Sequence, residues 1–187
     1  MIEDRPALAR NVYTKYVSDE GEIVWPEDSQ ERVLFARVLY GKQLISTFDY
    51  WFSRAVDLIE NPAPPKPFQR KNEAYKEDKY FRDRFSTLSA EQKQVVRHLV
   101  RTIAHGILFG VLVDLDQSYY GEYEIALKPR KVRGNDQAIR IAPDVPNDLH
   151  NELNDWILSF SKFADEIAEL IEINGGWEIG LKAFHNV

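Results

Sequence analysis

Apolar residues recur every three or four positions over three long stretches of the chain, the spacing that predicts amphipathic helices. The first stretch begins after Pro26 and ends at Asn61-Pro62, because proline removes an amide and biases its predecessor away from helix. The second occupies residues 88–117 and the third about 147–173. Residues 69–85 are mostly charged with a few aromatic anchors, which predicts a surface helix. The chain is therefore expected to be predominantly helical.

The stretch 88–117 has the pattern of a buried central helix. Ser89 and Gln92 have the spacing of a capping box, which satisfies free amides at a helix start. After Gly106 the polar face disappears and apolar residues occupy all sides, as expected where neighbours cover a helix completely. Gly106 and Gly110 lie one turn apart and are expected to let another backbone come close.

Two other regions alternate between apolar and polar residues, as strands do. Residues 122–127 and 138–142 show this alternation on either side of a polar loop, which predicts a hairpin. Residues 11–17 and 23–25, rich in β-branched and aromatic side chains, predict a second hairpin around a glycine-containing turn. The expected fold is α+β and predominantly helical, with long amphipathic helices around the buried central helix and one or two β-hairpins on one side.

Composition limits the class of protein. With 187 residues and 44% hydrophobic side chains, the chain 1–187 fits a single domain, and the proline-rich segment 62–67 is a stiff connector inside it. The absence of cysteine excludes disulfides and thiolate metal sites. No apolar run approaches the ~20 residues of a membrane span, and the N-terminus does not resemble a signal peptide. We expect a soluble, cytoplasmic protein without membrane contact, whose oligomeric state is open.

The net charge of −6 is unevenly distributed, and the C-terminal region 144–187 is strongly acidic. Such a face is either ordinary solvated surface or a docking surface for a cationic partner, whose association it would accelerate. The candidate binding residues lie on the last predicted helix. They are Asp148, Glu152, Asp155, Asp165, Glu166, Glu169 and Glu172.

Polar residues on the first half of the helix 88–117 are the main candidates for catalysis. Arg101 and His105, with His150 and the basic loop 128–133, could form a metal-independent nuclease or phosphotransfer site, the only case in which we expect nucleic acid as a partner. His98 and His105 lie about 10.5 Å apart at ~1.5 Å rise per residue, too far to share one zinc ion. A solvated polar stripe is the favoured interpretation, and we expect no metal or cofactor.

Two aspartates follow near the end of the same helix. Asp114 falls on the stripe that is apolar two turns earlier, so we expect it to be partly buried. Together with Asp116, Glu122 or Glu124 it could bind a hard cation, or it could accept hydrogen bonds from the backbone or an arginine where the chain turns into the hairpin. The structural role is favoured, because two aspartates at this spacing do not make a metal motif.

Three short motifs follow one another over residues 112–150: Leu112-Val113-Asp114-Leu115-Asp116, Gly121-Glu122-Tyr123-Glu124-Ile125 and Asp148-Leu149-His150. This order resembles a group of small bacterial proteins that includes immunity proteins of toxin systems. The resemblance implies a cytoplasmic protein that binds and neutralises a cognate toxin, with no catalytic residues. We therefore expect a non-catalytic binding protein, with the nuclease or phosphotransfer enzyme described above as the alternative.

Overall fold

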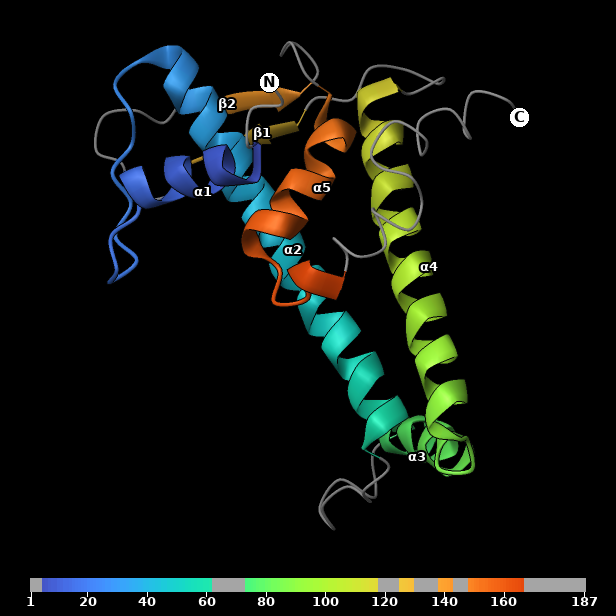
Figure 1. Cartoon of the computed structure of the whole chain (residues 1–187). Helices are drawn as coiled ribbons and strands as arrows, with labels where there is room; N and C mark the ends of the chain where they lie inside the picture. Colours follow the sequence, from blue (N-terminus) through green and yellow to red (C-terminus); the bar gives the residue numbers. More distant parts are fainter. Residues whose placement is uncertain (1–4, 62–72, 118–124, 130–137, 143–147, 167–187) are drawn as a thin grey trace. The chain divides into compact units, whose positions relative to one another are not determined.

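The computed structural model describes residues 5–61, 73–117, 125–129, 138–142 and 148–166 (Figure 1). This part of the chain is predominantly helical with one two-stranded sheet, as expected for the α+β class. Its elements are α1 (Arg5–Tyr16), α2 (Ser29–Glu60), α3 (Glu73–Phe85), α4 (Ala90–Gln117), β1 (Ile125–Leu127), β2 (Ile139–Ala142) and α5 (Leu149–Phe160). The predicted connector 62–67 lies outside the described residues.

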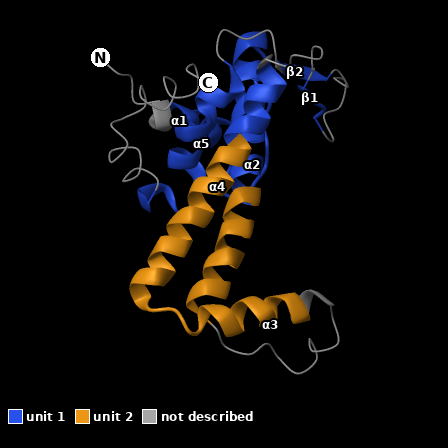
Figure 2. Ribbon diagram, turned by 90° about the vertical axis from the view of Figure 1, so that its right-hand side faces the viewer, with its two compact units in different colours: residues 1–46, 109–187 blue, residues 47–108 orange. Residues whose placement is uncertain are grey.

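The chain divides into two compact units, which Figure 2 colours separately. Unit 1 comprises residues 1–46 and 109–187, and unit 2 comprises residues 47–108. The long helices α2 and α4 each contribute one part to unit 1 and another to unit 2.

Helix α2 forms where the sequence predicts it. The Asp28 carboxylate accepts hydrogen bonds from the backbone N–H groups of Gln30 and Glu31, both at 2.9 Å, and so caps the first turn. Within unit 1 this helix supplies much of the hydrophobic core, because its apolar face is fully enclosed. The buried apolar side chains there are Phe35, Ala36, Val38 and Ile45.

The predicted N-terminal hairpin is half correct. Residues 11–16 are helical, as part of α1, whereas the tight turn that follows is present, with Gly21 at φ +81° and a single bridge between Val17 and Ile23. The edge of the Tyr13 ring packs on Phe160 of α5, with 5.8 Å between the ring centroids. Strand propensity depends strongly on context, and here packing against α5 outweighs it.

Helix α5 packs directly on α2 in unit 1. A Cβ atom at Gly41 would lie 2.2 Å from Cδ2 of Trp156, so only glycine allows this close approach. Strands β1 and β2 pair in an antiparallel manner, as predicted, and Ile139 and Ile141 of β2 are buried with Ala36. The core of unit 1 is therefore built on α2, α5 and the hairpin.

The predicted helix over 147–173 is interrupted. Helix α5 ends at Phe160, because Ser161 adopts an extended conformation at φ −77° and ψ 140°, and residues 164–166 are helical again. The Ser161 hydroxyl accepts a hydrogen bond of 3.0 Å from the backbone N–H of Phe163. Serine forms such local bonds readily, and they compete with helix continuation. Residues 167–173 lie outside the described part of the chain.

Helix α4 begins as predicted. The Ser89 N–H donates to Gln92 Oε1 at 2.9 Å, and the Gln92 N–H donates to Ser89 Oγ at 3.2 Å, which completes the capping box. The prediction that this helix is buried is wrong, because much of its apolar surface remains exposed. No atom lies within 4 Å of a Cβ built on Gly106 or Gly110, so neither glycine permits a close backbone contact here.

Helix α4 is long and apolar. Among the described residues it is the one helix whose length and composition would allow it to cross a membrane, a test that core helices of soluble proteins also pass. In unit 2, α3 and α4 are linked to the second part of α2 by ion pairs. These are Arg54–Asp78, Arg82–Asp57 and Arg97–Glu60.

Candidate functional site

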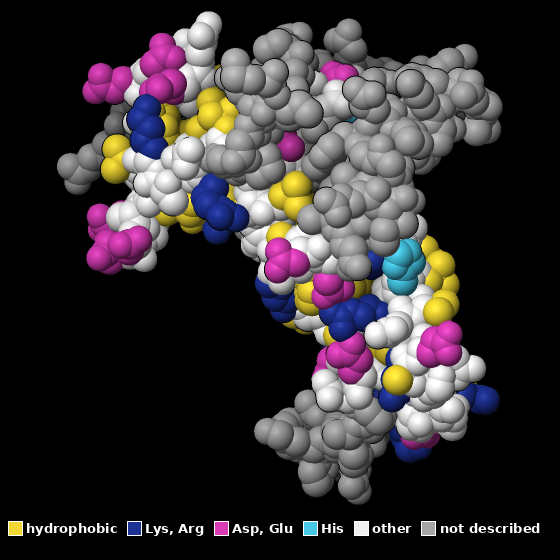
Figure 3. Space-filling view, in the orientation of Figure 1, with side chains coloured by type: hydrophobic (Ala, Val, Ile, Leu, Met, Phe, Trp, Pro, Cys, Tyr) yellow, Lys and Arg dark blue, Asp and Glu magenta, His cyan; other side chains and the backbone are white. Residues whose placement is uncertain are grey.

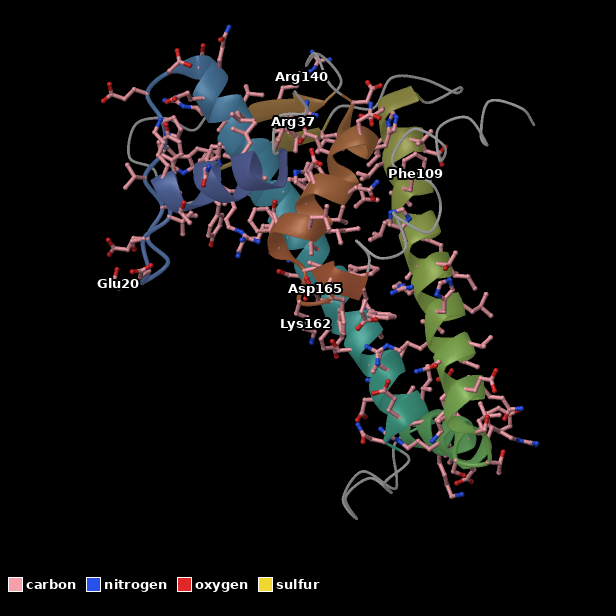
Figure 4. All side chains as sticks on the ribbon, in the orientation of Figure 1. Glu20, Arg37, Phe109, Arg140, Lys162 and Asp165 are labelled. Carbon is pink, nitrogen blue, oxygen red and sulfur yellow. The ribbon has the colours of Figure 1, made fainter. Side chains whose placement is uncertain are left out.

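A buried group of polar side chains lies in unit 1 where α2, the end of α4 and the start of α5 come together. We call it the polar cluster, and it consists of Arg37, Tyr40, Asp116, His150 and Glu152. Figure 4 labels Arg37 on α2 and Phe109 on α4. Charged residues are rarely buried unless they are paired, and the cluster contains two such pairs.

The first pair joins Asp116 to His150. Asp116 Oδ2 lies 2.9 Å from the backbone nitrogen of His150 and also 2.9 Å from its ring Nδ1. The side chains are 2% and 6% exposed. Because a carboxylate only accepts hydrogen bonds, this contact places a hydrogen on Nδ1. The Phe109 ring packs edge-on against the imidazole, with 5.5 Å between centroids.

This contact also caps α5. Asp148 occupies the N-cap position but makes no side-chain capping bond. The first turn of a helix leaves amides without internal partners, and Asp116 accepts one of them from a distant part of the sequence. Its negative charge lies at the N-terminus of α5, where the helix dipole favours an anion. The carboxylate therefore joins the end of α4 to the beginning of α5.

The second pair joins Arg37 to Glu152, with 2.7 Å between Nη2 and Oε1. Arg37 is fully buried and Glu152 largely so. Burial raises the pKa of Glu152, as do the charges of Asp155 and Asp116, while Arg37 opposes the shift. Glu152 therefore points into the protein, and its assignment to an outer docking face is corrected.

Tyr40 completes the polar cluster. Its pKa is raised, first by burial and then by the negative charge of Asp116. The edge of its ring packs against Trp156 of α5, with 6.1 Å between centroids. Tyr40 thus connects the polar cluster to the apolar core.

A histidine held by a carboxylate is the arrangement that orients imidazoles in acid–base catalysis. Catalysis also requires that the pair reach a substrate. In unit 1 the imidazole and the carboxylate are both buried, and the carboxylate is engaged by the α5 amide. The geometry therefore favours a structural role, in which the polar cluster fixes three helices together.

The remaining acidic candidates do not form one continuous helical face, because α5 ends at Phe160, after Asp155 and before Asp165. Asp148 and Asp155 are half-buried and Asp165 is exposed, whereas Glu166 is half-buried. Glu169 and Glu172 lie outside the described residues.

The catalytic candidates fall in different units. Arg101 is buried in unit 2, where its Nη2 lies 3.0 Å from Nδ1 of His98, and His105 is half-buried one turn further along α4. His150 belongs to unit 1 and pairs with Asp116. Convergence of these three residues stays a prediction. In the basic loop 128–133, Lys128 is exposed and residues 130–133 lie outside the described residues.

Of the two aspartates near the end of α4, Asp114 is not the buried one, and the prediction that it is partly buried is wrong. Asp114 is exposed, and Asp116 is the buried carboxylate with a partner. Asp116 is buried because it contacts His150 of α5. The spacing of residues within α4 contains no information about this contact.

Within the described residues, no group of three or more His, Cys, Asp or Glu side chains is placed to hold a metal ion. No protein family, curated protein or solved structure matches the chain.

Proposed function

We propose that this chain is a non-catalytic cytoplasmic binding protein, and specifically an immunity protein that neutralises a cationic toxin domain. Two features of unit 1 support a binding role. Inside the fold, Arg37 pairs with Glu152 and Asp116 pairs with His150. By contrast, solvent-exposed acidic side chains gather in the turn between α1 and α2 of the same unit. The proposal rests mainly on this acidic surface.

This surface, which we call the acidic turn, connects α1 to α2 (Figure 3; Glu20 is labelled in Figure 4). Its exposed acidic residues are Asp19, Glu20, Glu22, Glu27 and Asp28. Ile23 and Val24 lie among them and are 47% and 68% exposed. Protein interfaces commonly combine an apolar centre with a polar rim. The negative charges would steer a basic partner towards these two aliphatic side chains.

Asp165 adds a further exposed acidic group to unit 1, beside Lys162 (both labelled in Figure 4). It is the described member of the predicted docking residues that faces solvent most fully. We include it in the proposed binding surface as a secondary contributor. Glu152 is left out, because it pairs with Arg37 in the core.

The test uses the product of the gene encoded next to this one, in two assays. The first measures its affinity for the purified chain at low and high salt, and the second measures growth when both are expressed together. We expect tight binding that weakens as salt rises, because screening reduces attraction between exposed charges, and we expect the chain to restore growth. Absence of both binding and protection would overturn the immunity function.

A charge variant locates the surface. Glu20→Gln/Glu22→Gln/Glu27→Gln removes three charges from the acidic turn and should slow association about tenfold or more at low salt. The matched control, Glu77→Gln/Asp83→Asn/Glu91→Gln, removes three exposed charges from unit 2 and should leave the association rate almost unchanged. Equal effects in both variants would show that the acidic turn is not the docking surface.

A further inference from the structure

The acidic turn contains a short antiparallel pairing of the backbone. Ile23 faces Val17 across an isolated bridge. The two hydrogen bonds of this bridge are formed by the residues on either side of the pair. They join the Ser18 N–H to the Glu22 carbonyl and the Val24 N–H to the Tyr16 carbonyl, both at 2.9 Å.

This pattern determines where the backbone of Ile23 points. In an antiparallel pair, residues that exchange hydrogen bonds with each other alternate with residues that do not. Ile23 is of the second kind, so its N–H and C=O point away from Val17, towards the outer side of the turn. Within the described part of the chain, neither group has a hydrogen-bond partner. Ile23 therefore presents an open edge of the kind that accepts a further strand.

The side chains at this edge suit an apolar contact with such a strand. Ile23 and Val24 are both exposed and both β-branched, the type of residue that packs well between strands. Trp25, which follows them, packs on Phe35 of α2 with 5.2 Å between the ring centroids, so the edge is attached to the core of unit 1. Glu20, labelled in Figure 4, lies at the projecting end of the turn.

The charges around Ile23 indicate the chemistry of the strand that would bind there. Asp19, Glu20, Glu22 and Glu27 are exposed, and none of them forms an ion pair with another described residue. Opposite charges on neighbouring strands attract each other, whereas like charges repel. A strand with lysine or arginine residues therefore fits this edge. A second copy of the chain fits poorly, because it would bring the same carboxylates together.

We propose that the acidic turn binds its partner by strand addition. An extended segment of the partner, in which basic residues alternate with aliphatic residues, forms hydrogen bonds with the N–H and C=O of Ile23. In this mode of recognition the backbone bonds supply affinity and the side chains supply selectivity. The inference rests on the proposed function, in which the partner is a cationic toxin domain, and it specifies which kind of segment of that domain is bound.

A synthetic peptide tests strand addition without the toxin. The probe has about six residues, the length of an ordinary strand, and alternates lysine with valine. Saturating peptide should slow hydrogen exchange of the Ile23 amide in the full chain about tenfold or more, as measured by nuclear magnetic resonance, because the amide gains an acceptor. The Val24 amide, which already donates to Tyr16, is the internal reference and should change little. A peptide with glutamate in place of lysine should leave both exchange rates unchanged.

A pair of variants separates the backbone contribution from that of the side chain. Ile23→Pro and Ile23→Ala both shorten the aliphatic side chain, but only proline also lacks the N–H. Neither hydrogen bond of the bridge uses this N–H, and thermal unfolding checks that both variants are folded. Ile23→Pro should bind the lysine peptide about tenfold more weakly than Ile23→Ala, because an acceptor on the peptide then loses its donor.

Two results would overturn strand addition and leave the immunity function intact. One is that the lysine peptide does not bind at millimolar concentration. The other is that it binds, but the Ile23 amide exchanges as before and both variants bind equally well, which would assign the affinity to side-chain charge alone. Conversely, the neighbouring gene product may neither bind nor protect while the lysine peptide slows exchange at Ile23. That result would refute the immunity function and support the open edge as a strand-binding site.

Discussion

A single oxygen of Asp116 binds both the backbone amide and the ring Nδ1 of His150, each at 2.9 Å. The two residues are separated by |i−j| = 34 along the chain. Because both side chains are buried, water cannot readily replace either hydrogen bond. We infer that this contact makes the start of α5 depend on the end of α4.

Removal of the Asp116 carboxylate should therefore destabilise the protein. Asp116→Ala removes a helix cap and leaves two buried donors without their acceptor, so we expect it to lower the free energy of unfolding by about 2–4 kcal/mol. Asp114→Ala is the matched control, because Asp114 lies on the same helix and is exposed. We expect the control to change stability by less than about 0.5 kcal/mol. Urea unfolding followed by circular dichroism measures both, and equal losses would contradict the capping role.

The Arg37–Glu152 pair should show strong coupling. Arg37→Met leaves the buried Glu152 carboxylate without this guanidinium, so it should lower the free energy of unfolding by about 3–5 kcal/mol. Glu152→Gln should cost clearly less, because the neutral amide resembles the protonated carboxyl that burial favours. The double variant should be more stable than the sum of the single losses predicts. The exposed pair Lys15–Glu31 provides the comparison and should show far weaker coupling. A sum of independent losses at Arg37 and Glu152 would argue against a coupled pair.

Glu152 should also give the stability a distinctive pH dependence. Its pKa in the folded protein is raised above the usual value of 4.5, mainly by burial. The folded state therefore holds the carboxyl proton of Glu152 more tightly than the unfolded state does. The stability that this proton contributes is fully present below pH 4.5 and is lost as the pH rises through the pKa of the folded protein. Relative to Glu152→Gln, the natural chain should lose stability as the pH rises above 4.5.

Glu31 should behave in the opposite way. Hydrogen bonds from Lys15 and Tyr16 lower the pKa of Glu31 below its usual value of 4.5. The stability that the Glu31 carboxylate contributes is therefore present above pH 4.5 and is lost as the pH falls through the pKa of the folded protein. Unfolding midpoints of the natural chain, Glu152→Gln and Glu31→Gln across this pH range reveal both slopes. The same direction of change in both comparisons would contradict the assignment.

Gly41 should tolerate no side chain while Trp156 occupies its present position. The Cβ of Gly41→Ala would lie 2.2 Å from the indole, so helices α2 and α5 must shift, at an expected loss of about 1–3 kcal/mol. In a Trp156→Leu background, which frees space, the same substitution should have a much smaller effect. Thermal unfolding of the four proteins measures this difference. An equal effect in both backgrounds would show that the indole is not the obstacle.

The sequence predicts elements whose signals are local. The start of α2 after Pro26, the Ser89–Gln92 capping box and the alternation in β1 and β2 all depend on neighbouring residues, and the structure confirms each of them. The helical state of residues 11–16 depends instead on α5, which follows much later in the chain. Strand propensity alone therefore gave the wrong element there.

Burial was the least predictable property. Hydrophobic spacing suggested that α4 is enclosed, but spacing records only where apolar side chains lie on a helix, not whether a neighbour covers them. For the same reason, spacing cannot predict which of Asp114 and Asp116 is buried, since the difference in their burial arises from the position of α5. The polar cluster cannot be predicted from local patterns, because Arg37 and Tyr40 are far in sequence from Asp116 and His150.

The Asp116–His150 contact gives the chain a built-in reporter of local opening. The His150 amide hydrogen exchanges with solvent only when its acceptor moves away, so its exchange rate follows fraying of the last turn of α4 as well as opening of α5. A nuclear magnetic resonance signal from this one amide thus records whether the two helices open together or separately. Cooperative opening would mean that α4 and α5, although distant in sequence, behave as one folding unit.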